Sequence, residues 1–254
     1  MIQLLRKAAR RIRSARHLIR FRWWAMKLDL QLRRNGGRLV LDVSSTPQMD
    51  SQPRLVVVQT GPDRGQLTLR LGEDVHFGHD VVIEVWASGT NVLALGDHSV
   101  LHGCTLQIRS GSLIAKDHVQ IRDHSVVKSY GDLRLGSGVI VSYSSAIHCE
   151  RSVVLQDLVA GAERVTIIDS DKELSASDDF FNDRPSRVSP VLIGRNTFLA
   201  AGVVIARGVN IGANSAVAAN AVVTKGDYPD GWLLGGIPAR PLKDLSSGTA
   251  VEPS

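Results

Sequence analysis

Aliphatic side chains recur at every sixth position between Val191 and Val223. A helix repeats near every 3.6 residues and a strand every 2, so neither element alone explains a period of six. Six residues fit a short extended side followed by a corner, and three such sides close one coil of a solenoid. One aliphatic side chain of each side then points into a shared interior. These positions are Ile193, Leu199, Ile205, Ile211, Val217 and Val223.

The same pattern extends toward the N-terminus, where it begins at Leu71 and acquires a longer period. Leu95, Ala115, Leu135 and Leu155 start corresponding segments twenty residues apart, which is one eighteen-residue coil with two extra corner residues. Over six coils, fifteen of the eighteen predicted inward positions are Val, Ile or Leu, and this count favours a parallel β-solenoid. The later inward positions of the longer coils are Leu101 and Gln107, Ile121 and Val127, Val141 and Ile147, and Gly161 and Ile167.

The segment from Val191 to Arg240 resembles the hexapeptide-repeat acyltransferases, in the branch that O-acetylates sugars and polysaccharides. The resemblance is carried by the six-residue repeat and by TKGDYPDGWLLGGIPAR, which is similar to the exit segment of that family. It implies an all-β fold, a left-handed parallel β-helix. An amphipathic α-helix is expected in front of it.

That helix is predicted in a strongly basic segment, residues 1–34, which holds eleven Lys or Arg and one acid, Asp29. Basic residues interrupt every apolar run well before the roughly 18 residues needed to span a bilayer. Two interpretations stay open. The helix either lies on an anionic membrane with Phe21, Trp23 and Trp24 among the headgroups, or packs on the β-helix or on neighbouring subunits. The predicted apolar face comprises Leu5, Ala8, Ile12, Ala15, Ile19, Trp23, Met26 and Leu30.

Composition adds the cellular context. Aromatic residues make up only 5% of the chain, which suits a narrow solenoid interior. Two cysteines, Cys104 and Cys149, form no disulfide framework, so we expect a cytoplasmic protein, with peripheral contact to the inner face of the membrane as an option. No nucleic-acid motif accompanies the basic segment.

The expected organisation is a helical arm (1–34), lead-in strands that cap the solenoid (35–70, with strands at Arg38–Val43 and Leu55–Gln59), the β-helix (71–226, with a protruding loop at 170–190) and an exit segment with tail (227–254).

The resemblance also implies a chemistry. Acetyl-CoA is the acyl donor, the chain forms a homotrimer, and a histidine acts as general base on a hydroxyl or amino group of a sugar or glycan. Imidazole suits this role because its pKa lies near neutral pH. The residues implied for coenzyme A are the small side chains Ala200, Ala201, Ala218 and Ala219 beside the pantetheine arm, and Thr224, Lys225 and Arg240 near the phosphates and pantetheine.

The usual place of the catalytic histidine holds none in this chain. In the stretch VTIIDSDKEL the matching residue is Lys172, or Glu173 on a one-residue shift. Lysine is a poor base near neutral pH because its reference pKa is about 10.4. His148, in SSAIHCERSVVLQD one coil earlier, follows the inward Ile147 and should therefore point outward. The candidate catalytic residues are His148, Lys172 and Glu173.

The missing histidine leaves a second interpretation open, a catalytically silent β-helix that serves as a scaffold for glycan synthesis at the membrane surface. Binding of acetyl-CoA separates the enzyme from the scaffold. Two Asp-His pairs, Asp97-His98 and Asp117-His118, occupy equivalent positions in successive coils. Stacked pairs of this kind suit a transition metal, but a solvated ladder of corner residues is the favoured interpretation, and no metal is predicted.

Overall fold

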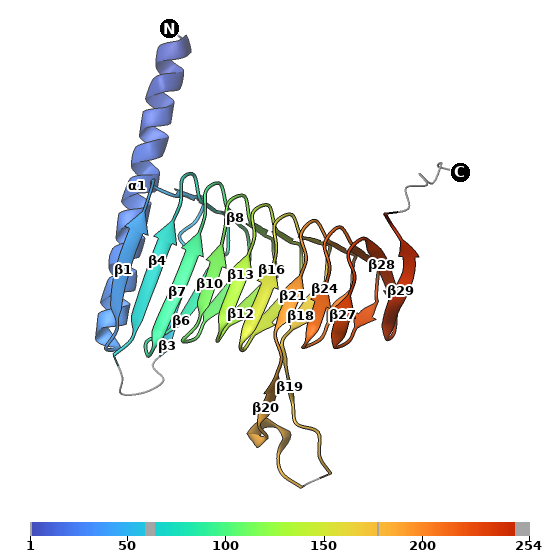
Figure 1. Ribbon diagram of the computed structural model, residues 1–254. Coiled ribbons are helices and arrows are strands. Elements are labelled where there is room, and N and C mark those ends of the chain that lie inside the picture. The colour runs from blue at the N-terminus through green and yellow to red at the C-terminus, as the bar shows by residue number, and fades with distance from the viewer. Residues whose placement is uncertain (1, 59–63, 177, 247–254) are drawn as a thin grey trace.

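A computed structural model describes residues 2–58, 64–176 and 178–246, with the side chains of the first helix described from residue 15 onward. The helix α1 (Ile2–Arg34) precedes a parallel β-helix whose coils stack in one row (Figure 1). Within the described residues, the strands form three mainly parallel sheets of nine, ten and eight members, and β19 (Ser170–Lys172) and β20 (Ser186–Val188) form a separate antiparallel pair. Every complete coil contributes one strand to each sheet, so the predicted parallel β-helix with an N-terminal helix is confirmed.

The three sheets are called A, B and C here, and the chain visits them in that order. Sheet A holds β1 (Arg38–Val43), β4 (Gln66–Leu71), β7 (Thr90–Leu95), β10 (Ser112–Ala115), β13 (Asp132–Leu135), β16 (Ser152–Leu155), β21 (Val191–Ile193), β24 (Val209–Ile211) and β27 (Gly226–Tyr228). Sheet B holds β2 (Gln48–Met49), β5 (His76–Phe77), β8 (Val100–Leu101), β11 (Gln120–Ile121), β14 (Ile140–Val141), β17 (Ala160–Gly161), β22 (Phe198–Leu199), β25 (Ala216–Val217), β28 (Trp232–Gly236) and β29 (Ala239–Asp244). Sheet C holds β3 (Arg54–Val58), β6 (Val82–Trp86), β9 (Thr105–Ile108), β12 (Val126–Ser129), β15 (Ala146–Cys149), β18 (Thr166–Ile168), β23 (Val204–Ile205) and β26 (Val222–Val223).

The strand register confirms the predicted coil starts. One inward position within a coil differs from the prediction. The predicted coil starts, from Leu95 to Ile211, pair directly from coil to coil in sheet A. In sheet C, however, Val127 pairs with Leu106 rather than with Gln107. That coil reaches sheet C one residue early, and a shift of one residue moves a side chain to the other face of a strand. Leu106 is therefore buried, and Gln107, predicted to point inward, lies on the outer face.

Corners explain many of the small and polar residues between strands. At the corners that follow sheets A and B, most coils place one residue in the left-handed region, with positive φ. Glycine, asparagine and aspartate adopt this region at the least cost. The left-handed corner residues are Asp74, His98, His118, Gly138, Leu158, Asn196, Asn214 and Gly231 after sheet A, and Asp80, Gly103, His124, Ser144, Arg164, Gly202 and Asn220 after sheet B.

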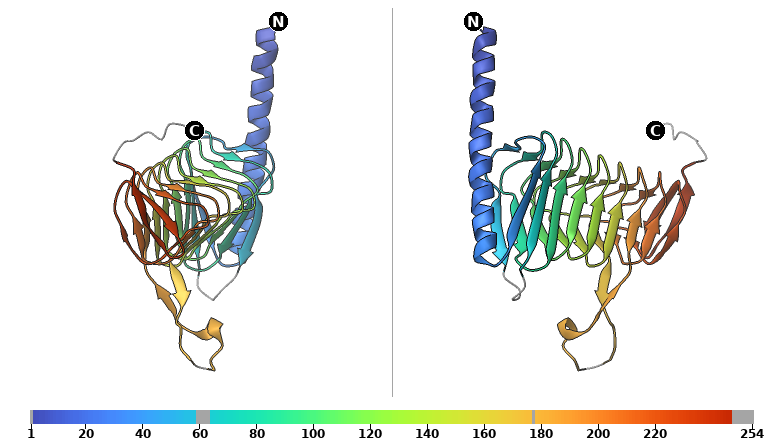
Figure 2. Two further views of the ribbon diagram at one scale, coloured as in Figure 1. Left: turned by 90° about the vertical axis from the view of Figure 1, so that its right-hand side faces the viewer. Right: turned by 60° about the vertical axis from the view of Figure 1, so that its left-hand side comes forward.

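Residues 35–70, predicted as lead-in strands that cap the solenoid, contain the first coil of the β-helix itself. Strands β1, β2 and β3 pair in parallel with β4, β5 and β6. The cap is α1, which contacts all three strands of this coil and runs across the end of the stack (Figure 2). At the opposite end β28 and β29 form an antiparallel hairpin. The last part of the predicted tail, residues 247–254, lies outside the described residues.

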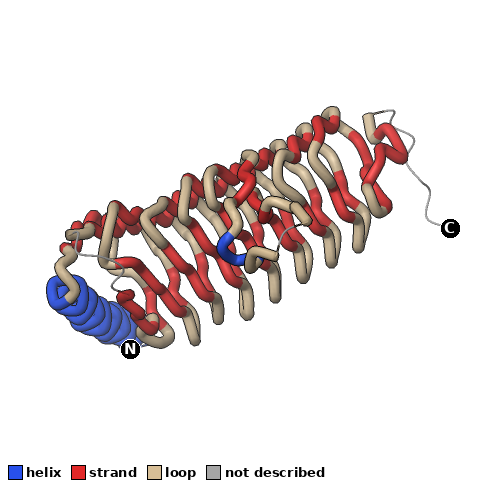
Figure 3. Tube along the Cα trace, turned by 90° about the horizontal axis from the view of Figure 1, so that it is seen from below, coloured by secondary structure: helices blue, strands red, loops and turns tan. Residues whose placement is uncertain are grey.

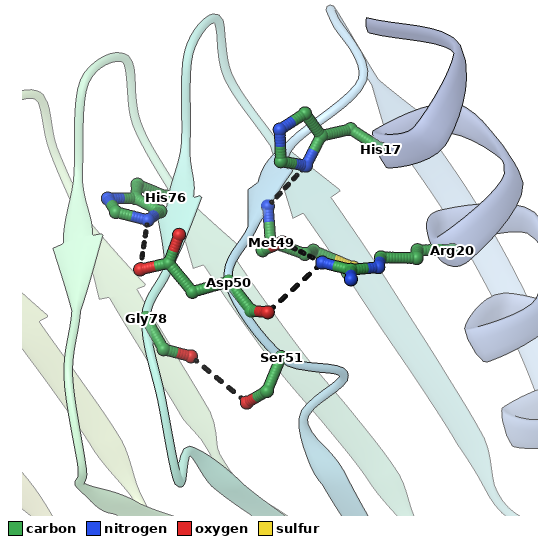
Figure 4. A network of polar contacts seen from close by, with 7 residues as sticks. All are labelled: His17, Arg20, Met49, Asp50, Ser51, His76 and Gly78. Carbon is green, nitrogen blue, oxygen red and sulfur yellow. Dashed lines mark hydrogen bonds and ion pairs between the residues drawn. The ribbon is translucent and has the colours of Figure 1, made fainter. Parts of the chain in front are cut away.

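The cap closes the end of the apolar interior and also satisfies exposed backbone groups. Phe21, Trp24, Ala25, Leu28 and Leu32 of α1 are buried in the same cluster as the first interior side chains. An unpaired strand edge needs hydrogen-bond partners. His17 and Arg20 supply them, because the Met49 N–H donates to His17 Nδ1 and Arg20 donates to the Met49 and Asp50 carbonyls (Figure 4).

The buried face of α1 is not the predicted one. Ile19, Trp23, Met26 and Leu30, on the predicted face, are 47–58% exposed. The interpretation that put Phe21 and Trp24 among lipid headgroups is wrong, because both are buried in the cap. From residue 15 onward, where its side chains are described, the helix therefore has two apolar faces, and one of them is buried against the first coil while the other is exposed.

Two adjacent tryptophans provide a test of this assignment. Trp24 is 1% exposed, packs against Phe21 and Phe77, and donates its indole N–H to the Pro53 carbonyl at 2.9 Å. Replacing Trp24 by alanine is expected to lower the free energy of unfolding by about 3 kcal/mol. The same change at Trp23, which is 55% exposed, should cost less than about 0.5 kcal/mol. Urea unfolding followed by circular dichroism measures both, and equal losses would contradict the assigned faces.

Candidate functional site

His148 lies on the outer face of sheet C, as its alternation with Ile147 predicts. In β15 it pairs with Lys128 of β12 on one side and with Ile168 of β18 on the other. The Tyr130 ring stacks on the imidazole with centroids 5.6 Å apart and planes at 29°. Arg109 in turn donates to the Tyr130 hydroxyl and to Glu84. Tyr130 therefore contacts the imidazole, and Arg109, which also pairs with Glu84, holds Tyr130 in turn. The sequence pattern did not indicate these contacts.

A hollow of about 420 Å³ opens beside His148. Its other wall is the hairpin of β19 (Ser170–Lys172) and β20 (Ser186–Val188), which protrudes from the β-helix (Figure 1) and, seen from below, lies over its middle coils (Figure 3). This hairpin belongs to the predicted loop 170–190, which also contains the short helix η1 (Phe181–Asp183). The lining residues are Tyr130, His148, Glu150, Ile168, Ser170, Asp171, Lys172 and Ser186.

The surroundings of His148 favour the neutral imidazole. Burial lowers the pKa of His148 below its usual 6.5, and the positive charge of Lys128 lowers it further. The carboxylates of Asp169 and Glu150 oppose this, and Arg109 adds to the lowering. The net direction is downward, so at neutral pH the ring is unprotonated and able to accept a proton.

The two other candidate bases are placed differently. Lys172 lines the same hollow, but its ammonium donates to the carbonyls of Asn182 and Arg184 at 3.0 and 2.8 Å. These two bonds tie the Lys172 side chain to the loop and hold the loop in shape. Glu173 is exposed and lines a separate hollow inside the loop. Of the three candidates, His148 has the environment of a base.

Asp169 is a further residue of this region that the sequence analysis missed. Its side chain is 0% exposed, and it accepts the backbone N–H of Glu150 on one oxygen and those of Arg151 and Ser152 on the other, at 2.7 to 2.8 Å. These bonds fix the corner that follows His148. The sequence could have indicated this role. Alternation from the inward Ile167 points Asp169 inward as well, and a buried carboxylate requires hydrogen-bond donors.

The residues implied for coenzyme A lie at two edges of sheet C, except for Arg240, which lies on β29 of sheet B. Ala200 and Ala218 stack at the corner where the chain enters this sheet, each followed by a second alanine, Ala201 and Ala219. Thr224 and Lys225 follow β26 at the other edge, and Thr224 continues the outer row of His148 and Ile168. Arg240 is exposed on β29. A single chain therefore does not bring the alanine corner and His148 together.

The Asp-His pairs have a structural explanation. Asp97 accepts the backbone N–H of Glu73, and Asp117 accepts that of Asp97, so each aspartate fixes the corner of the preceding coil. His98 and His118 follow as the left-handed corner residues, with rings stacked 5.0 Å apart. Within the described residues, no group of three potential metal ligands is found.

Comparisons with known proteins agree with the repeat. The family described as bacterial transferase hexapeptide (six repeats) matches residues 190–225. A probable acetyltransferase of Mycobacterium tuberculosis is 29% identical over 127 residues, which is 50% of this chain and 42% of the relative. The galactoside O-acetyltransferase of Escherichia coli is 28% identical over 123 residues, 46% of this chain and 57% of the relative. The matched regions thus span about half of the length of these relatives.

Among solved structures, the polySia-specific acetyltransferase NeuO is similar in fold. It superposes with a TM-score of 0.52 at 14% identity, over 83% of this chain and 88% of that one. The likeness extends beyond the matched repeats to most of the β-helix. Together, the repeat match at residues 190–225 and the two curated relatives show that about half of this chain is similar to bacterial acetyltransferases with hexapeptide repeats.

Proposed function

We propose that the protein transfers an acetyl group from acetyl-CoA to a hydroxyl or amino group of a sugar or glycan precursor. The observation that carries this proposal is the neutral, half-buried His148 at the wall of the hollow beside the hairpin. The relationship to the galactoside O-acetyltransferase of Escherichia coli supports both the reaction and the sugar acceptor.

In this mechanism, His148 accepts the proton of the acceptor group as that group attacks the thioester carbonyl. The tetrahedral intermediate carries an oxyanion, which a backbone N–H stabilises. Its collapse breaks the carbon–sulfur bond, and the leaving thiolate takes the proton from the imidazolium. The acetylated acceptor and free coenzyme A leave, and His148 returns to its neutral form. Lys172 and Glu173 remain outside the proton transfer, Lys172 because its ammonium holds the loop.

The distribution of the coenzyme A residues supports a homotrimer. The alanine corner (Ala200, Ala201, Ala218 and Ala219) and His148 lie at different edges of sheet C. We propose that coenzyme A binds between two subunits, with the alanine corner along the pantetheine arm and Thr224, Lys225 and Arg240 near the phosphates. Sedimentation equilibrium should then give three times the mass of the chain, and a monomer at micromolar concentration would contradict this assembly.

We also propose that the trimer works at the cytoplasmic face of a membrane, which it contacts peripherally through residues 1–34. None of the described helices has the length and apolar character needed to cross a bilayer. The local excess of positive charge in this segment supports attraction to anionic lipid.

Binding and turnover of acetyl-CoA test the enzymatic proposal directly. We expect coenzyme A to bind in isothermal titration calorimetry, and thiol release from acetyl-CoA to accelerate when sugar acceptors are added. A protein that neither binds coenzyme A nor releases thiol would support the silent scaffold instead.

Lys128 provides a pH test of the base. Replacing Lys128 by glutamine removes a positive charge that lowers the pKa of His148. The pKa should then rise toward 6.5, and because turnover requires neutral imidazole, the acid limb of the kcat–pH profile should move to higher pH. Lys116→Gln is the control, since Lys116 is an exposed residue that pairs with Asp157 away from the site. An acid limb that does not move would exclude His148 as the titrating group.

A further inference from the structure

The exposed apolar face of α1 is a feature that the proposed active site does not use. This stripe consists of Ile19, Trp23, Met26 and Leu30, each about half exposed. With 3.6 residues per turn, the four residues point away from the side on which Phe21, Trp24, Leu28 and Leu32 enter the cap. The stripe therefore faces away from the β-helix.

Basic residues flank the stripe on both sides. Arg16, Arg22, Lys27 and Arg34 are all exposed and lie between the two apolar faces of the helix. The acid of this segment, Asp29, already pairs with Arg33 at 2.7 Å. The result is an apolar strip with a positively charged margin, the arrangement of a helix that lies in the plane of a membrane interface.

A second positively charged feature lies at the same end of the molecule. Where α1 meets β1, a hollow of about 670 Å³ is lined by Arg33, Arg38 and Arg64 together with glycine backbone. Guanidinium groups bind phosphate oxygens through paired hydrogen bonds. This hollow suits the phosphate of a lipid headgroup.

The orientation of α1 fits a flat surface. The helix runs across the end of the coil stack, not along it, and its N-terminal part extends beyond the β-helix (Figures 1 and 2). A helix of 33 residues is about 50 Å long. Lying on a bilayer, it would direct the axis of the β-helix away from the membrane. His148, in the fifth coil, would then stand roughly 30 Å from the surface, clear of the headgroups.

We infer that the N-terminal end of the β-helix is a docking face for an anionic phospholipid bilayer, with the stripe of α1 inserted at the headgroup level. This inference rests on the peripheral contact proposed above, but not on acyl transfer. A second copy of the chain is the other candidate occupant. Two stripes face to face would bring two basic margins together, and like charges oppose that contact. An anionic bilayer matches both the apolar strip and its margin.

The test uses the full-length protein and vesicles of phosphatidylcholine, with or without phosphatidylserine. The stripe variant Ile19→Ser/Trp23→Ser/Met26→Ser removes three exposed side chains of the stripe. The hairpin control Leu174→Ser/Phe180→Ser/Phe181→Ser removes three exposed apolar side chains elsewhere. We expect the wild type and the hairpin control to co-sediment with phosphatidylserine vesicles, more weakly as salt rises. The stripe variant should bind at least about tenfold less, with an unchanged melting temperature.

Each other outcome overturns part of the inference. If the stripe variant bound vesicles as strongly as the wild type, the docking face would be rejected. A peripheral contact through the arginines alone would then explain the binding. No binding by the wild type at low salt would reject both. A stripe variant with a smaller mass in lipid-free sedimentation would assign the stripe to a second copy. Coenzyme A binding, measured in the same samples, should be equal for all three proteins. Absence of coenzyme A binding would count against the enzymatic proposal, and the vesicle results would still test the docking face.

Discussion

Replacing His148 by alanine is expected to lower the turnover of acetyl transfer by about 10²–10⁴-fold, the usual contribution of a general base. Coenzyme A affinity and trimer mass should stay unchanged, because His148 lies on the outer face of sheet C and supports neither the interior nor the implied phosphate contacts. Initial rates at saturating acetyl-CoA, with calorimetry for coenzyme A, measure the two effects independently.

Three further variants serve as comparisons for His148→Ala. Lys172→Ala and Glu173→Ala should be mild, because Lys172 holds the loop and Glu173 lies outside the hollow of His148. Arg240→Ala should raise the KM for acetyl-CoA and leave kcat at saturation nearly unchanged. If Lys172→Ala or Glu173→Ala abolished turnover while His148→Ala retained it, the base would be at the family's usual position in an altered form.

Replacing Asp169 by alanine is expected to have the largest effect on stability, a loss of about 4 kcal/mol or more. The change leaves three N–H groups, of Glu150, Arg151 and Ser152, without their acceptor. Each orphaned group costs about 1–3 kcal/mol. An asparagine side chain retains one acceptor oxygen, so the substitution Asp169→Asn should lose less. Urea unfolding of the purified variants measures both losses.

The control for Asp169 is its exposed neighbour. Asp171 pairs with Arg187 and Arg207 at the surface of the hairpin. Surface ion pairs contribute about 0–1 kcal/mol, so Asp171→Ala should hardly change the free energy of unfolding. A stable Asp169→Ala protein would show that the corner after His148 is held by the β-helix itself and not by the buried carboxylate.

Most of the β-helix was predictable because its signal is local. A strand alternates its side chains and each coil repeats the same three sides, so the aliphatic positions alone gave the coil starts from Leu95 to Ile211. The outward direction of His148 and its place beside the loop 170–190 followed from the same alternation. The one misplaced interior residue, Gln107, arose where a corner is one residue shorter, a length that side-chain periodicity does not specify.

The candidate site was predictable only in part. Periodicity brought His148 and Lys172 to the same region, and both line one hollow. It could not show which of the two can act as a base, because the groups around His148 come from neighbouring coils and the carbonyls that accept from Lys172 come from the segment between β19 and β20. Lys128 pairs with His148, which is twenty residues further along the chain, and the Tyr130 ring stacks on the imidazole. The loop carbonyls of Asn182 and Arg184 accept hydrogen bonds from Lys172.

The sequence by itself therefore determined the repeating β-helix, its basic N-terminal helix and the family resemblance. Only the tertiary structure decided which of the two apolar faces of α1 is buried. Both faces have helical spacing and both contain a tryptophan, so local pattern treats them alike. The choice depends on which face fits the open end of the first coil, where Trp24 meets Phe77 and Pro53. That fit exists only once the chain has folded, and it leaves Trp23 exposed on the opposite side.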